Sequence, residues 1–146
     1  MKSKISLAFK KCKKEKRTAL ITYTVAGDNS KRNSLEILKT LSKHADILEL
    51  GFPHNTPIAD GGQIQTSAYR AIKNGIKIND VFSIVAQFKK LKKNKPIIFS
   101  TGGCTEEDID RVYNYLKKNN TKFALLHCVS SYPTPPELVN LELITY

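Results

Sequence analysis

Short apolar segments alternate along this chain with longer segments in which apolar residues recur at helical spacing. The short segments are rich in β-branched and aromatic residues and predict strands at 19–27, 45–51, 95–100 and 123–130. The longer segments predict helices at 34–44, 63–75, 79–93 and 106–119. Residues 133–146 predict a further turn or helix.

End signals support the predicted helices. Gly75 is a natural left-handed stop after the second helix, and Asn79 can cap the third. Thr105 can cap the fourth helix, whose first turn is acidic and whose last turn is basic, as the helix dipole favours. These signals separate the helices from the strands on either side.

Strands separated by helical crossovers predict an α/β fold with a parallel sheet and helices outside it. Chemistry in such folds gathers at the carboxyl ends of the strands. In this sequence those ends are Gly27–Asp28, Glu49–Asp60, Ser100–Cys104 and Cys128–Tyr132.

Two carboxylates stand at the second strand end. Glu49 interrupts the apolar run from Ile47 to Leu50, and Asp60 follows on a loop before Gly61. Burial disfavours the charged form of Glu49, which suits the group to donate and accept protons. Two carboxyl groups in different surroundings can divide acid and base roles. Pairing of Glu49 with a lysine or arginine at the rim of the sheet explains its position equally well.

Composition adds limits to this picture. A chain of 146 residues with 40% hydrophobic and 25% charged content fits one globular domain. No apolar run is long enough for a membrane span, so no membrane association is expected. Three scattered cysteines fit reduced thiols in a cytoplasmic protein better than a disulfide framework or a zinc site.

The net charge of +11 is unevenly distributed. Residues 1–99 hold 20 Lys and Arg against 7 Asp and Glu, whereas residues 100–146 hold 4 against 6. The basic clusters Lys10–Arg17 and Lys89–Lys95 lack the interleaved aromatic residues that stack on bases. Solvated helix ends therefore explain the charge better than nucleic-acid binding.

The segment "LELGFPHNTPIADGGQIQ", with "ALITYTVAGD" and "SAYRAIKNGIKINDVF", resembles the tryptophan synthase alpha chain over residues 17–98. The resemblance implies cleavage of indole-3-glycerol phosphate to indole and glyceraldehyde 3-phosphate. It implies that Glu49 is the general acid/base, that Asp60 holds the indole N–H, and that Tyr23 lies against the indole. It also implies a beta-chain partner, to which pyridoxal phosphate belongs, and no cofactor in this chain.

The segment "KPIIFSTGGCTEEDID…FALLHCVSSYPTPPELVNL" resembles sialic acid (N-acetylneuraminate) synthase over residues 95–146. That family condenses phosphoenolpyruvate with an N-acetyl sugar and uses a divalent metal. The resemblance implies substrate contacts by Ser100, Thr101, Ser130 and Tyr132. The family's metal-binding histidines have no counterpart here, and His127 is interpreted as a strand residue rather than a ligand.

Both families are (β/α)8 TIM barrels, so we predict a partial barrel of about four parallel strands. It forms one domain over 1–146, with an alpha-chain-like part at 1–98 and a synthase-like part at 99–146. Because the phosphate site of such barrels lies at the last strands, a lyase of this length is expected to be weak or inactive. The alternatives are the synthase condensation and a non-catalytic chimeric scaffold. Two unpaired sheet edges predict a homodimer.

Overall fold

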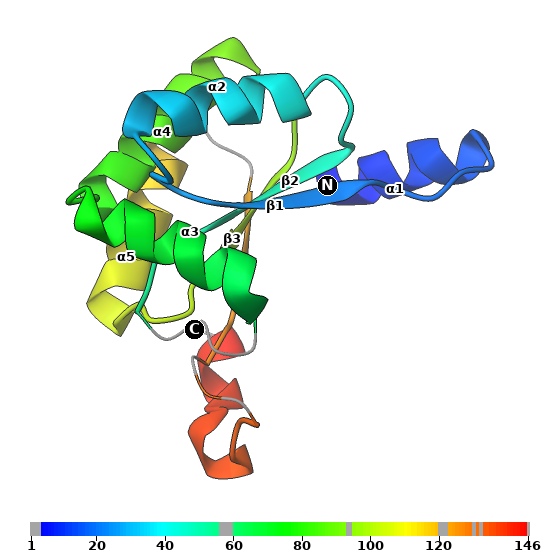
Figure 1. The fold of residues 1–146 in the computed structure, drawn as a ribbon. Helices are drawn as coiled ribbons and strands as arrows, with labels where there is room; N and C mark the ends of the chain where they lie inside the picture. The colour runs from blue at the N-terminus through cyan, green and yellow to red at the C-terminus, as the bar shows by residue number, and fades with distance from the viewer. Residues whose placement is uncertain are drawn as a thin grey trace.

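Helices and strands alternate along the chain in the predicted order (Figure 1). The computed structural model describes residues 4–55, 60–92, 95–119, 123–129, 131 and 133–145. Its elements are α1 (Lys4–Lys14), β1 (Ile21–Val25), α2 (Lys31–Leu41), β2 (Ile47–Gly51), α3 (Gly61–Lys73), α4 (Ile78–Leu91), β3 (Ile97–Ser100), α5 (Glu106–Lys118), β4 (Phe123–Leu126), and the 3-10 turns η2 (Pro136–Leu138) and η3 (Leu141–Thr145).

The four strands form one parallel sheet in the order β1-β2-β3-β4. Tyr23 stands opposite Glu49, and Glu49 stands opposite Ile98. Farther along, Gly51 pairs with Ser100. The α/β class and the parallel sheet predicted from the sequence are therefore confirmed, and the register brings β2 and β3 together at their carboxyl ends.

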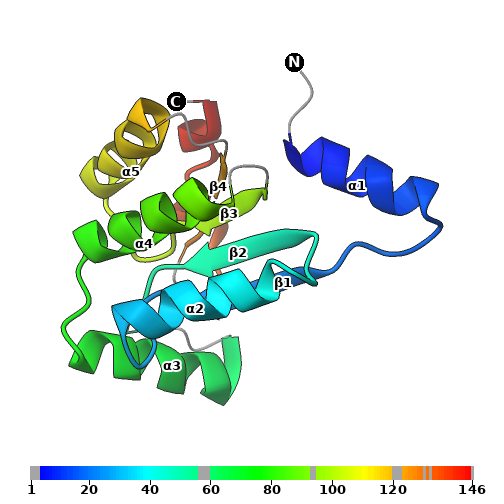
Figure 2. The ribbon, with the colours of Figure 1, turned by 90° about the horizontal axis from the view of Figure 1, so that it is seen from above.

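One face of the sheet carries the hydrophobic core. Because side chains alternate along a strand, Leu48 and Leu50 on β2 share a face with Ile97 and Phe99 on β3. This outer face is covered by α2, α4 and α5, which lie side by side in Figure 2. Core residues come from both sides of residue 98, so the two parts expected from sequence share one core.

The opposite, inner face of the sheet is partly open to solvent. Ile21, Tyr23 and Leu126 keep 41%, 36% and 40% of their surface exposed, and Glu49 is half-buried. These residues occupy the alternate positions that the outer-face core leaves free. Of the polar side chains predicted to act at the site, Tyr23 and Glu49 therefore lie on the face that the helical layer does not cover.

The basic N-terminal segment forms α1, a helix that the sequence analysis did not predict. Its connection to the sheet is Arg17, whose Nη1 and Nη2 donate to the two carboxylate oxygens of Asp46 at 2.7 and 2.8 Å. The backbone N–H of Leu20 donates to the same carboxylate at 2.9 Å. The Arg17 guanidinium holds the pKa of Asp46 well below its usual range. Within the described ranges, no helix is long and apolar enough to cross a membrane.

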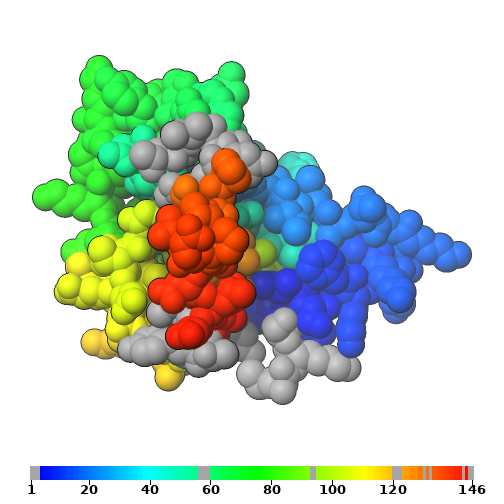
Figure 3. Space-filling model, turned by 90° about the horizontal axis from the view of Figure 1, so that it is seen from below, coloured from blue at the N-terminus to red at the C-terminus, as the bar shows by residue number. Residues whose placement is uncertain are grey.

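The segment after β4 turns twice in 3-10 form, in agreement with the turn or helix predicted at 133–146. Figure 3 shows it in orange and red near the middle of the face seen from below, beside α5. The His127 ring forms a hydrogen bond between Nε2 and the carbonyl of Val139 at 2.6 Å, which ties η2 back to the end of β4. His127 was interpreted as a strand residue, but β4 ends at Leu126 and His127 follows it directly.

Truncating Phe99 tests the helix-covered core. Phe99 of β3 is fully buried in the core beneath the helices, so Phe99→Ala should lower the free energy of unfolding by about 3–5 kcal/mol. Tyr69→Ala, at a site that is 64% exposed, should change it by no more than about 0.5 kcal/mol. Urea unfolding followed by circular dichroism measures both, and equal losses would contradict this assignment of the core.

Candidate functional site at the carboxyl ends of the strands

Glu49 and Ser100 form the centre of the candidate site. Ser100 ends β3, next to Gly51 on β2, and its hydroxyl donates to Oε1 of Glu49 at 2.5 Å. The two residues were predicted from different resemblances, yet the strand register places them in direct contact. This hydrogen bond holds one of the two carboxylate oxygens of Glu49.

The ion-pair explanation for Glu49 is not observed. Among the residues that the structure describes, no Lys or Arg lies within ion-pair distance of its carboxylate. Its hydrogen bond comes from a neutral hydroxyl instead. The half-buried carboxylate of Glu49 thus has a neutral partner, and its acid/base role stays a prediction.

Tyr23 lies across the end of the neighbouring strand. A Cβ atom placed on Gly51 would stand 2.0 Å from Oη of Tyr23, so only glycine leaves room for this ring. Burial raises the pKa of Tyr23 to about 12, and the negative charges of Asp60 and Glu49 contribute to the rise. The phenol therefore lies within electrostatic range of both predicted catalytic carboxylates.

Asp60 occupies the N-cap position of α3. Its side chain is exposed and makes no cap hydrogen bond, so it is not committed to holding the helix. Residues 56–59, which connect it to the end of β2, lie outside the described residues. The negative charge of Asp60 contributes to the raised pKa of Tyr23, and a role for Asp60 at the site stays a prediction.

The other three predicted substrate contacts are Thr101, Ser130 and Tyr132. Thr101 is buried, and its hydroxyl donates to the carbonyl of Leu126 at 2.8 Å, so it joins β3 to β4. Ser130 and Tyr132 lie outside the described residues. Substrate contacts by these three residues stay predictions.

A partly buried cluster of polar side chains holds α3 in place, and the sequence analysis did not predict it. The carboxylate of Asp28, just after β1, accepts hydrogen bonds from Arg70 Nε and Nη2, each at 2.7 Å, and from Ser67 Oγ at 2.6 Å. Arg70 lowers the pKa of Asp28. Asp28 stood out in sequence as a strand-end acid, but its partners lie 39 and 42 residues away, so local patterns could not identify them. Because Asp60 begins α3, this cluster sets where Asp60 lies.

The loop after β3 leads into α5, whose first turn is acidic. Asp108 in the first turn of α5 accepts from the backbone N–H of Thr105 at 3.3 Å, which occupies one of the free donors at this helix start. Glu106 and Glu107 add further negative charge. In the described part of the chain, no group of three or more side chains could hold a metal ion.

The fold and this site define one class of protein: a partial (β/α)8 barrel with polar side chains at the carboxyl ends of its strands. The sequence model described as "Tryptophan synthase alpha chain" matches residues 9–122. The chain belongs to the tryptophan synthase alpha chain family.

Individual relatives agree with this assignment. The Pelagibacter ubique tryptophan synthase alpha chain is 74% identical over 96 residues, which cover 66% of this chain and 36% of the relative. A Legionella pneumophila tryptophan synthase alpha subunit has a TM-score of 0.71 at 27% identity, covering 83% of this chain and 47% of that one. A Pyrococcus furiosus tryptophan synthase α2β2 complex contains a chain with a TM-score of 0.60 at 36% identity, covering 70% and 44%.

The extent of the matches bears on the two predicted parts. The chain spans about a third of the length of the curated relatives it matches. The family match runs to residue 122, past the boundary predicted at 98 and across α5. These comparisons provide no support for a sialic acid synthase segment at 95–146, which stays a prediction.

The alkaline stability of the protein tests the surroundings of Tyr23. Its folded pKa of about 12 exceeds the ordinary value of 10, so its contribution to stability is complete below pH 10 and is lost as pH rises through about 12. Tyr23→Phe should therefore lose less stability over this window than the parent chain. Tyr69→Phe, at an exposed position, is the control. Denaturant unfolding at intervals of pH measures the difference, and identical slopes for all three proteins would contradict it.

Proposed function

We propose that this chain is a tryptophan synthase alpha-type carbon–carbon lyase that cleaves indole-3-glycerol phosphate to indole and glyceraldehyde 3-phosphate with weak turnover. The observation that carries the proposal is the contact of Glu49 with Ser100, beside Tyr23 and within range of Asp60. Family membership supports the choice of substrate. The reaction belongs to tryptophan biosynthesis and is expected in the cytoplasm.

In this proposal, Glu49 moves protons at the carbons of the substrate. Ser100 fixes one of its oxygens at 2.5 Å, so the free oxygen faces the substrate in a constant orientation. Tyr23 contributes the flat surface against which the indole lies, and Asp60 accepts a hydrogen bond from the indole N–H. No cofactor takes part, since acid/base chemistry at a carbon–carbon bond needs none here.

Weak turnover follows from the open inner face. Acid/base groups act best where water is excluded, whereas Ile21, Tyr23 and Leu126 are partly exposed on this face. Binding of the substrate phosphate supplies energy for chemistry at the distant reacting centre. We propose that the four strands bind this phosphate weakly. An ordinary enzyme turns over about 10 times per second, and the rate of this chain should be far below that value.

Replacing Glu49 tests the catalytic role. Glu49→Gln keeps the hydrogen bond from Ser100 but cannot transfer the proton, so indole release should fall about 10²- to 10⁴-fold. Glu36→Gln, on the exposed side of α2, removes the same charge and should leave the rate unchanged. Indole is measured by its capture in a coupled assay with a tryptophan synthase beta chain present.

Three outcomes of this assay would count against the proposal. Equal indole release by the parent chain and Glu49→Gln would favour the non-catalytic scaffold. A parent rate near 10 per second would contradict the weak turnover. Loss of activity in Glu36→Gln as well would indicate that net charge, rather than Glu49, sets the rate.

A beta chain is the proposed protein partner. The Pyrococcus furiosus structure that this chain resembles is that of a tryptophan synthase α2β2 complex. We propose that the carboxyl ends of the strands, with Glu49 and Asp60, face such a partner, and that pyridoxal phosphate belongs to that partner. Indole leaving this end would then pass directly to the beta chain.

The synthase alternative receives less support from the structure. Ser100 faces the open site, as a phosphate contact would require, but its hydroxyl already donates to Glu49. Thr101 is buried and bonded to β4. A carboxylate beside Ser100 repels phosphoenolpyruvate, so we do not choose condensation with an N-acetyl sugar as the function.

We further propose that two copies pair through the open sheet. Within the described residues, β1 and β4 each have one unpaired edge, and such edges pair readily with another chain. Ile21 and Leu126 add exposed apolar surface beside those edges. Together these features fit a homodimer in which two half-barrels cover each other's inner faces.

Light scattering tests this assembly. The parent chain should have the mass of a dimer at micromolar concentration, and Leu126→Lys should shift it to monomer because a charge enters the apolar face. Leu141→Lys, at a 63% exposed position in η3, is the matched control and should stay dimeric. A monodisperse monomer for the parent chain would overturn the prediction.

A further inference from the structure

A groove of about 790 Å³ lies at the amino ends of the strands, at the opposite end of the sheet from Glu49. It is formed by α1, the end of α4, and the residues that lead into β2 and β3. Its volume falls within the roughly 300–1,000 Å³ of small-molecule sites. We call it the lysine groove after the lysines that line it, Lys4, Lys11, Lys90, Lys92 and Lys95.

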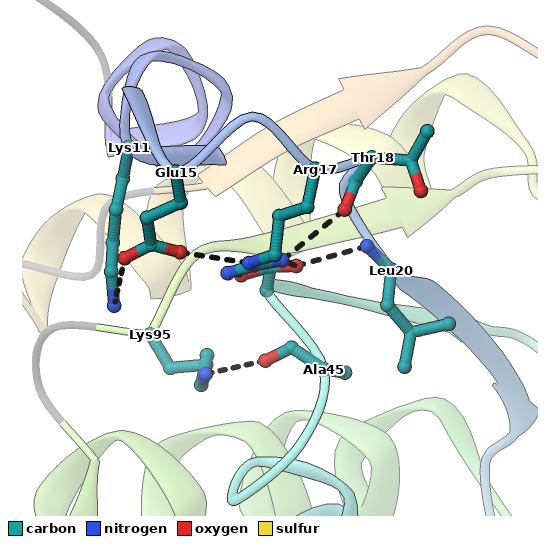
Figure 4. Close-up of polar contacts among 8 residues, drawn as sticks. Lys11, Glu15, Arg17, Thr18, Leu20, Ala45 and Lys95 are labelled. Atoms are coloured by element: carbon teal, nitrogen blue, oxygen red, sulfur yellow. Dashed lines mark hydrogen bonds and ion pairs between the residues drawn. The ribbon is translucent and has the colours of Figure 1, made fainter. Parts of the chain in front are cut away.

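The acids near the lysine groove are already engaged by arginine. Both carboxylate oxygens of Asp46 accept from Arg17, at 2.7 and 2.8 Å, and Glu15 accepts from Nε of Arg17 at 2.7 Å (Figure 4). Lys11 lies 3.8 Å from the remaining oxygen of Glu15, a long and exposed pair. The groove therefore keeps a positive charge that these acids do not neutralise.

The wall of the groove is held in place by buried amine contacts. Lys95 Nζ donates to the carbonyl of Ala45 at 2.5 Å, and Lys89 Nζ donates to the carbonyl of Lys95 at 2.6 Å. Burial lowers the pKa of Lys95; the negative charge of Asp46 opposes this shift, and the charges of Lys11 and Lys92 add to it. Lys11 and Lys92 therefore repel Lys95, which its hydrogen bond to Ala45 holds in place. An anion between these lysines would relieve that repulsion.

The floor of the groove is apolar. Leu7 of α1 and Leu91 of α4 line it with 50% and 56% of their surfaces exposed, together with Ala8 and Pro96. Among the described residues that line the groove none is aromatic, so they offer no platform for stacked bases. A ligand that fits this surface combines an anionic group with an apolar body.

We propose that the lysine groove binds a small organic anion, an aryl or alkyl phosphate, with the phosphate among the lysines and the apolar body on Leu7 and Leu91. The site is separate from the carboxylate site and needs no part of it. Because the charges are partly exposed, the affinity should fall as ionic strength rises and the Debye length shortens.

Titration of the full chain with phenyl phosphate, followed by amide chemical shifts, tests the proposal. Binding should shift signals from α1 and from Lys90 to Lys92. Lys90→Glu should weaken it by at least about tenfold, because attraction becomes repulsion at one wall. Lys118→Glu makes the same change of charge in the last turn of α5, outside the groove, and should alter the affinity less than about twofold.

A second comparison tests the contact of the apolar body separately from that of the phosphate. Leu91→Ala should lower the affinity for phenyl phosphate several-fold and leave the lower affinity for inorganic phosphate unchanged. Circular dichroism verifies that each variant is folded. Equal weakening by Lys90→Glu and Lys118→Glu would show nonspecific attraction and overturn the proposal. So would binding to phosphatidylglycerol vesicles without binding to phenyl phosphate, since that outcome indicates a membrane surface as the ligand.

Discussion

The alternation of side chains along the parallel strands is the constraint on which the rest of this structure depends. Burying Leu48, Leu50 and Phe99 beneath the helical layer requires the neighbouring positions to face the other way. Glu49 and Tyr23 occupy such positions, so the same packing that stabilises the fold presents the polar groups on the inner face. A one-residue slip of β2 would bury the carboxylate in the core and expose its leucines.

Strand register then assembles the site. Glu49 and Ser100 are 51 residues apart in sequence, but β2 and β3 are neighbours and their carboxyl ends coincide. Gly51 contributes by the absence of a side chain, which leaves space for the Tyr23 ring. The Asp28–Arg70 pair fixes α3 and with it the position of Asp60. Each of these contacts depends on a different pair of elements, yet all converge on one end of the sheet.

The two ends of the sheet have opposite electrostatic character. Carboxylates gather at the carboxyl ends, whereas lysines from α1, α4 and the approach to β3 gather at the amino ends. Arg17 links the N-terminal helix to the sheet by donating hydrogen bonds to both carboxylate oxygens of Asp46, so this acid is already paired. Part of the excess positive charge of the chain therefore lies along one groove, and further lysines lie in the last turns of the helices.

Sequence by itself determined the α/β class, the order of the strands, and the prominence of Glu49, because hydrophobic periodicity and helix end signals are local properties. The resemblance of residues 17–98 identified the family correctly. The basic N-terminal segment was not recognised as a helix, since lysines are as numerous in it as apolar residues. Its connection to the sheet, the contact of Arg17 with Asp46, joins segments that are 29 residues apart.

Only the tertiary structure decided which distant groups meet. The Ser100 partner of Glu49, the Arg70 partner of Asp28 and the lysine groove each join segments that no local pattern links. Sequence left Glu49 balanced between acid/base chemistry and a rim ion pair, and the structure places the neutral hydroxyl of Ser100 beside it. The acid/base role of Glu49 stays a prediction. The physical reason is that hydrogen bonds and charge pairs act over a few ångströms in space, a distance that folding sets and sequence separation does not.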